Sequence, residues 1–251
     1  IISAVRNVMK YIGNTESNSY LSFLEAAYIF LDNYHECSLM ESIISENENL
    51  LSNEAFGTVN DRALLLNNKA MLPINRNNKL AKSISMMNKA LSMCDNKANP
   101  VLFANINMNL GLLYIENKET ERGLEFMDKA YLFIKLTRAY NNDFITIARN
   151  YAATFSENGK VTKALKVLTE CEFAAEGCCS NNHAALLYDL GAAYILSGNY
   201  PLAVKKYHLS FNEYFALGCS EELTARKIAA TRQMQRYGYE YPKEWEFNYL
   251  E

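Results

Sequence analysis

The chain has 251 residues, of which 49% are hydrophobic and 21% are charged, and it carries a net charge of −3 at pH 7. This composition supports a full hydrophobic core and excludes a disordered chain, and the slight acidic excess argues against direct contact with nucleic acid. Only 10 Gly and 4 Pro are present, too few for the many turns of a β-sandwich or barrel.

Signals for export or for a membrane are missing from the sequence. No run of 18 apolar residues occurs, no signal peptide is visible, and none of the 6 cysteines forms a CxxC pair. These features predict a cytoplasmic protein with reduced thiols and no membrane contact. Because the chain begins at Ile1 rather than Met, we expect a fragment, and an effector domain before Ile1 stays an open alternative.

Residues 1–53 are expected to be N-terminal capping helices, approximately 2–12, 17–33 and 36–51. The apolar side chains of the middle segment recur at helical spacing. Such helices would form a degenerate pair at one end of a stack.

Residues 54–217 contain four copies of one pattern, predicted at 54–96, 97–138, 139–176 and 180–217. Each copy has a large apolar residue and a small one, then an aromatic or aliphatic residue one turn later, then small, large and small residues at helical spacing. The anchor residues lie 40, 41 and 39 positions apart; they are Met71, Gly111, Ala152 and Gly191. Each copy therefore predicts a hairpin of two helices, and the fold class is all-α, an α-solenoid of antiparallel helix pairs.

Turn residues separate the predicted helices. Two short polar breaks lie between helices, at Glu157-Asn158-Gly159-Lys160 and at Ser197-Gly198-Asn199-Tyr200. The first turn of a new helix is favoured at Asn99-Pro100 and at Pro201.

Residues 218–251 are predicted as a capping helix over 220–236 and an aromatic tail that includes Trp245, Phe247 and Tyr249. The tail either folds back on the last repeat or serves as a docking or homodimerisation segment.

The repeats resemble the tetratricopeptide repeat (TPR) family, mainly through Leu110, Gly111, Tyr114, Gly123 and Ala130, and through Leu190, Gly191, Tyr194, Ala203, Tyr207 and Ser210. The period of about 40 residues exceeds the usual 34, and the closing prolines are mostly absent. The resemblance implies a superhelix that binds a peptide or protein. The long repeats are similar in style to bacterial regulatory domains such as the peptide-pheromone receptors.

No catalytic, metal or cofactor site is predicted. The sequence lacks HExxH, GxSxG and the glycine-rich nucleotide motifs, and His183, expected just before a helix, has no catalytic partner in the pattern. We therefore expect a protein that is not an enzyme.

The candidate binding site is the inner groove, which the first helix of each repeat lines in the resembled family. Lys69, Asn109 and Asn150 share one position, with Asp189 in the fourth repeat, and asparagine amides can pair with both the N–H and C=O of a peptide. Ordinary polar groove lining is the alternative. The full set of candidate residues is Asn68, Lys69, Asn105, Met108, Asn109, Leu112, Arg149, Asn150, Tyr188 and Asp189.

Two functions remain open from the sequence. The first is a regulatory or sensory repeat domain of a bacterial signalling or transcription-regulatory protein, which binds a peptide in the groove. The second is a scaffold or adaptor that contacts a folded partner, or another domain of the same chain, through its convex face or its aromatic tail.

Overall fold

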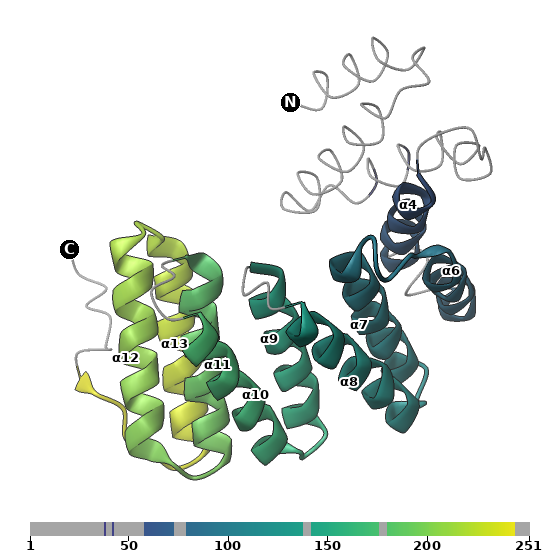
Figure 1. The fold of residues 1–251 in the computed structure, drawn as a ribbon. Coiled ribbons are helices and arrows are strands. Elements are labelled where there is room, and N and C mark those ends of the chain that lie inside the picture. Colours follow the sequence, from purple (N-terminus) through teal and green to yellow (C-terminus); the bar gives the residue numbers. More distant parts are fainter. Residues whose placement is uncertain are drawn as a thin grey trace. The chain divides into compact units, whose positions relative to one another are not determined.

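The computed structural model describes residues 58–72, 79–137, 142–175 and 180–243, together with Ser38 and Ser42. All the secondary structure of these ranges is helical apart from turns, which agrees with the predicted all-α class (Figure 1). The helices are α4 (Val59–Met71), α6 (Leu80–Met93), α7 (Pro100–Glu116), α8 (Thr120–Leu136), α9 (Asn142–Glu157), α10 (Val161–Ala174), α11 (Asn181–Leu196), α12 (Tyr200–Ala216) and α13 (Ser220–Arg236).

The predicted helices of residues 1–53 lie outside the described residues, apart from Ser38 and Ser42, which are helical. None of the helices that the structure describes is both long and apolar enough to cross a membrane. The chain forms two compact units, Ile1–Phe133 and Ile134–Glu251, and each is described by itself.

Helix starts follow the predicted capping residues. Asn99 accepts a hydrogen bond from the Leu102 amide at 3.0 Å, with Pro100 as the first residue of α7. Pro201 occupies the first turn of α12, as predicted. His183 was expected just before a helix, and this prediction was wrong by a few residues. The helix begins earlier, because Ser180 is the N-cap of α11 and its side chain accepts a hydrogen bond from the His183 amide at 3.1 Å. His183 therefore lies inside the first turn of the helix.

The turn between α11 and α12 shows why glycine is suited to position 198, which was predicted to lie in a polar break. Its φ of 79° is in the left-handed region, which glycine adopts without a steric penalty. The Asn199 amide donates to the Tyr194 carbonyl at 2.9 Å and the Gly198 amide donates to the Ile195 carbonyl at 3.0 Å, which closes the helix end. The same turn between α7 and α8 places Lys118 at φ 65° without glycine.

Small residues hold the paired helices together in the first unit. A Cβ atom on Gly111 of α7 would lie 2.8 Å from the Gly123 carbonyl oxygen of α8, so this pair of helices meets backbone to backbone. In the neighbouring pair, Met87 and Ala90 of α6 are completely buried and pack in one core with Ala70 of α4 and Leu110 of α7.

In the second unit, α11 packs against α12 and α13 (Figure 1). Gly191 of α11 faces the ring of Tyr207 of α12, which is fully buried. The predicted helix 220–236 is confirmed as α13, whose Ala230 and Met234 complete this core.

The first residues of the aromatic tail return to the last helix pair. The rings of Tyr239 and Tyr200 stack with centroids 5.1 Å apart, and the Tyr200 hydroxyl donates to the Glu240 carbonyl at 2.6 Å. This part of the tail is therefore folded back on the last repeat, which is the first of the two alternatives predicted for it. Trp245, Phe247 and Tyr249 lie outside the described residues.

Candidate functional site

Burial along the first helices corrects the predicted alignment of the first repeat by one residue. Buried side chains recur 7, 5, 4 and 1 positions before the anchor; in α7 they are Ala104, Ile106, Asn107 and Leu110, before Gly111. In α4 the same spacing selects Ala63, Leu65, Leu66 and Lys69, before Ala70. The anchor is therefore Ala70, which is fully buried, and not Met71.

The corrected alignment changes which side chains occupy equivalent positions. Asn68, and not Lys69, stands two positions before the anchor, where Asn109, Asn150 and Asp189 stand in the later repeats. Lys69 is 7% exposed, one position before the anchor, among the core residues. The series at this position therefore consists of three amides and one carboxylate.

In the first unit, side-chain amides connect α4 to α7. The Asn109 amide nitrogen donates to the Asn67 side-chain oxygen at 2.9 Å, and the Asn67 amide nitrogen donates to the Asn68 side-chain oxygen at 3.0 Å. Asn67 is buried, whereas Asn68 and Asn109 are half-buried. The amides thus form a hydrogen-bonded row that crosses from one first helix to the next.

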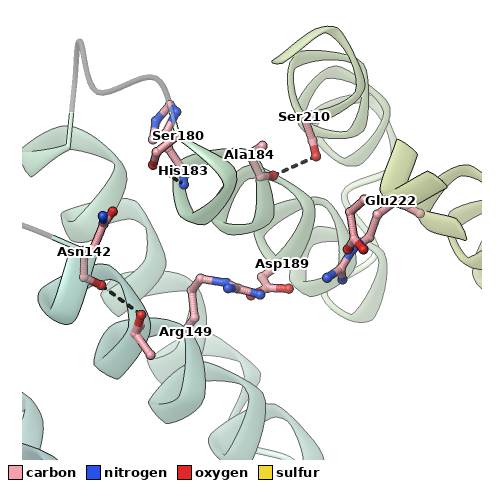
Figure 2. Close-up of polar contacts among 10 residues, drawn as sticks. Asn142, Arg149, Ser180, His183, Ala184, Asp189, Ser210 and Glu222 are labelled. Carbon is pink, nitrogen blue, oxygen red and sulfur yellow. Dashed lines mark hydrogen bonds and ion pairs between the residues drawn. The ribbon is translucent and has the colours of Figure 1, made fainter. Parts of the chain in front are cut away.

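In the second unit, an ion pair occupies the corresponding place. Nε of Arg149 on α9 lies 2.6 Å from Oδ2 of Asp189 on α11, and both side chains are partly exposed. Figure 2 shows the Arg149 side chain extended toward Asp189, with Glu222 of α13 on the other side of that carboxylate. Burial raises the pKa of Asp189 above its ordinary value, and the positive charge of Arg149 opposes this rise.

Arg226 of α13 adds a second guanidinium beside Asp189. Its Nε lies 2.7 Å from Oε1 of Glu222, and its guanidinium lies 4.8 Å from the centroid of the Tyr188 ring. Tyr188 is buried against Tyr207, with ring centroids 5.1 Å apart, and burial raises the pKa of Tyr188 to about 12. Charged groups of both signs therefore alternate across α9, α11 and α13, and each is paired.

The candidate residues divide by exposure. Met108 and Tyr188 are 2% and 8% exposed, so their side chains contribute to helix packing more than to an accessible wall. Asn150 is exposed, whereas Asn68, Asn105, Asn109, Leu112, Arg149 and Asp189 have intermediate exposure. Among the candidate residues Arg149 is already engaged, because its Nε donates to Asp189.

Two residues of this surface were not predicted. Asn67 was missed because the alignment of the first repeat was one residue off. Arg226 was missed because residues 220–236 were assigned to a cap with no binding role. Extending the period from Gly191 by a further 39 residues reaches Ala230, which is fully buried, and this signal would have shown that α13 continues the series of first helices.

Within the described ranges, no group of three or more His, Cys, Asp or Glu side chains has the arrangement of a metal site. Among the thiols that the structure describes, Cys171 is buried, and burial raises its pKa to about 12. A thiol with so high a pKa is a poor nucleophile at neutral pH.

No model of a known protein family matches the chain, and no curated protein matches it in sequence. Solved structures do match: the crystal structure of BtubC (BKLC) from P. vanneervenii has a TM-score of 0.63 at 13% identity, over 86% of this chain and 88% of that chain. Two crystal structures of a Podosopora anserina putative kinesin light chain with nearly identical TPR-like repeats have TM-scores of 0.55 and 0.53, at 11% and 12% identity. These two matches cover 86% and 85% of this chain and 97% and 96% of those chains. At such identities the likeness shows the fold alone, and the fold is an α-solenoid of TPR-like repeats.

Proposed function

We propose that this chain is a non-enzymatic regulatory or sensory domain of a bacterial cytoplasmic protein, and that the first-helix faces bind an extended peptide or protein segment. The TPR-like fold supports protein–protein interaction as the general role. Accessible asparagine amides on first helices support a peptide ligand, because an amide can pair with a backbone N–H or C=O.

In each unit, taken by itself, the observation that carries the proposal is one accessible asparagine on a first helix. Among the described residues, the side chains of Asn105 on α7 and Asn150 on α9 have no hydrogen-bond partner, and both are at least partly accessible. Each amide offers two donors and one acceptor to a ligand. Neighbouring polar groups are already paired, so they hold the helices in register while these two amides stay available.

The test uses peptides selected from a random 12-residue display library against the full chain, with affinity measured by fluorescence anisotropy. Loss of one hydrogen bond to the peptide backbone costs about 1 kcal/mol, so Asn105→Ala or Asn150→Ala should each weaken binding about fivefold. Alanine also favours a helix by about 0.5 kcal/mol over asparagine, so both variants should be at least as stable as the wild type.

Asn212→Ala is the matched control, because Asn212 is an exposed asparagine on α12, a second helix. Peptide binding that is unchanged in Asn105→Ala and Asn150→Ala would reject the first-helix faces as the binding surface. Weaker binding in Asn212→Ala alone would place the selected peptide on a second helix and would contradict the proposal.

A further inference from the structure

A pocket of about 460 Å³ lies in the second unit, and none of the candidate residues described above lines it. Its walls come from α10, α11 and α12, and it is lined by Thr169, Glu172, Phe173, His183, Leu187, Leu209 and Glu213. This volume is within the range of pockets that bind small molecules or single large side chains.

The two carboxylates of the pocket are already paired. Glu172 forms an ion pair with Lys206, which connects α10 to α12 at the rim. Glu213 accepts a hydrogen bond from the Ser180 amide at 3.0 Å through Oε1, and its Oε2 lies 2.8 Å from Nδ1 of His183. Both carboxylates of the lining are therefore engaged by hydrogen-bond partners within the chain.

Glu213 also determines how His183 presents its ring. A carboxylate accepts the proton of Nδ1–H, so the neutral imidazole carries its lone pair on Nε2, at the opposite edge of the ring. Among the described residues, the His183 side chain makes no other hydrogen bond or ion pair, and it is 14% exposed. The lining of the pocket therefore includes a histidine whose ring is oriented by Glu213.

The apolar part of the pocket favours a flat ring. Two large hydrophobic side chains of the lining are well exposed, Phe173 of α10 at 81% and Leu209 of α12 at 42%. Leu187 of α11 is 4% exposed and provides a buried apolar surface. A guest ring can stack on Phe173 while it donates a hydrogen bond to His183.

We propose that this pocket binds an aromatic ring that carries an N–H or O–H donor, of the indole or phenol class, with Nε2 of His183 as the acceptor. The ring belongs either to a free small molecule or to a side chain of a partner segment. The proposal does not depend on peptide binding at the first-helix faces.

The test is an NMR titration of the full chain with indole at about pH 8, where an ordinary imidazole is neutral. The imidazole resonance of His183 should shift to saturation, with a Kd on the order of 1 mM for so small a ligand. His208 on α12 is outside the pocket lining and provides the internal reference. Benzothiophene, which has the same shape without the N–H, should bind at least fivefold more weakly.

Two variants separate the hydrogen bond from the shape of the pocket. His183→Phe should bind indole and benzothiophene equally, as seen by the shifts of the Leu187 and Leu209 methyl groups. Thr169→Trp, at an exposed position on the rim, should fill the pocket and abolish the shift without disturbing the core. Absence of a saturable shift at His183 in the wild type, or equal affinity for the two ligands there, would overturn the proposal.

A third ligand distinguishes the two sources of the ring. A short peptide with a central tryptophan that binds more tightly than indole would support a partner segment. Tighter binding of indole would support a free small molecule. Failure of both ligands to bind, in a chain that still binds its selected library peptide, would refute the pocket alone.

Discussion

Helices α11 and α12 approach closely at Gly191, which makes Gly191→Ala a sharp test of the packing. A Cβ atom there would lie 2.6 Å from Cδ1 and 2.7 Å from Cε1 of Tyr207. Normal contacts between carbon atoms begin at about 3.5 Å, so the ring or the helix would have to move by roughly 0.9 Å.

The ring of Tyr207 has no room to move. It is fully buried, it lies 5.1 Å from the Tyr188 ring and 6.1 Å from the Phe211 ring, and its hydroxyl donates to Gln233 of α13. Overpacking of this kind costs up to about 3 kcal/mol, whereas replacing a mid-helix glycine with alanine gains about 1 kcal/mol. We therefore expect a net loss of about 2 kcal/mol of unfolding free energy.

Urea denaturation followed by circular dichroism measures this loss. The matched control is Ala152→Gly, at the equivalent position of α9, where the native Cβ already fits and the variant should lose about 1 kcal/mol from helix propensity. Gly191→Ala combined with Tyr207→Leu should recover part of the loss through coupling between the two sites. A Gly191→Ala protein that is as stable as the wild type, or more stable, would refute this account of how α11 meets α12.

Three further predictions follow from single contacts. Lys118→Gly should stabilise the chain by about 1 kcal/mol in urea denaturation, since glycine relieves the left-handed backbone at φ 65°, and an unchanged midpoint would contradict this. A raised pKa means that Asp189 contributes most to stability below its ordinary pKa of 3.8, and that this contribution falls as the pH rises through the folded-state pKa. Asp189→Asn should therefore gain stability relative to the wild type as the pH rises from about 3 to about 6 in urea titrations, and a constant difference would refute the assignment. Tyr200→Phe removes the hydroxyl that donates to Glu240, so hydrogen exchange at the Tyr239 amide should accelerate about fivefold, and unchanged exchange would show that stacking alone holds the tail.

The sequence predicted several of the helix boundaries, because these depend on local chemistry. Asn99-Pro100 begins α7, and Gly198 ends α11 with a positive φ, as expected from the preferences of these residues. Lys118 shows the limit of this reasoning, since nothing in a lysine predicts a left-handed turn. That turn is imposed by the helix pair around it.

The candidate site was predicted less completely. The positions of Asn109 and Asp189 on the first helices followed from the period, but their partners did not. Asn67 was hidden by a shift of one residue in a repeat with a weak pattern, and a shift of one residue rotates a helical position by about 100°. Only the burial of Ala70 settled that alignment.

From the amino-acid sequence alone, the fold class and the repeat period followed, because small and large residues at helical spacing can bury their surface in one way, as paired helices. Only the tertiary structure decided which polar side chains are engaged and which are available. Arg149 became an ion-pair partner of Asp189, whereas Asn105 and Asn150 kept accessible amides. The pocket around His183 also depends on α10, α11 and α12 together, and contacts between distant segments of a chain are set by packing, which no local pattern encodes.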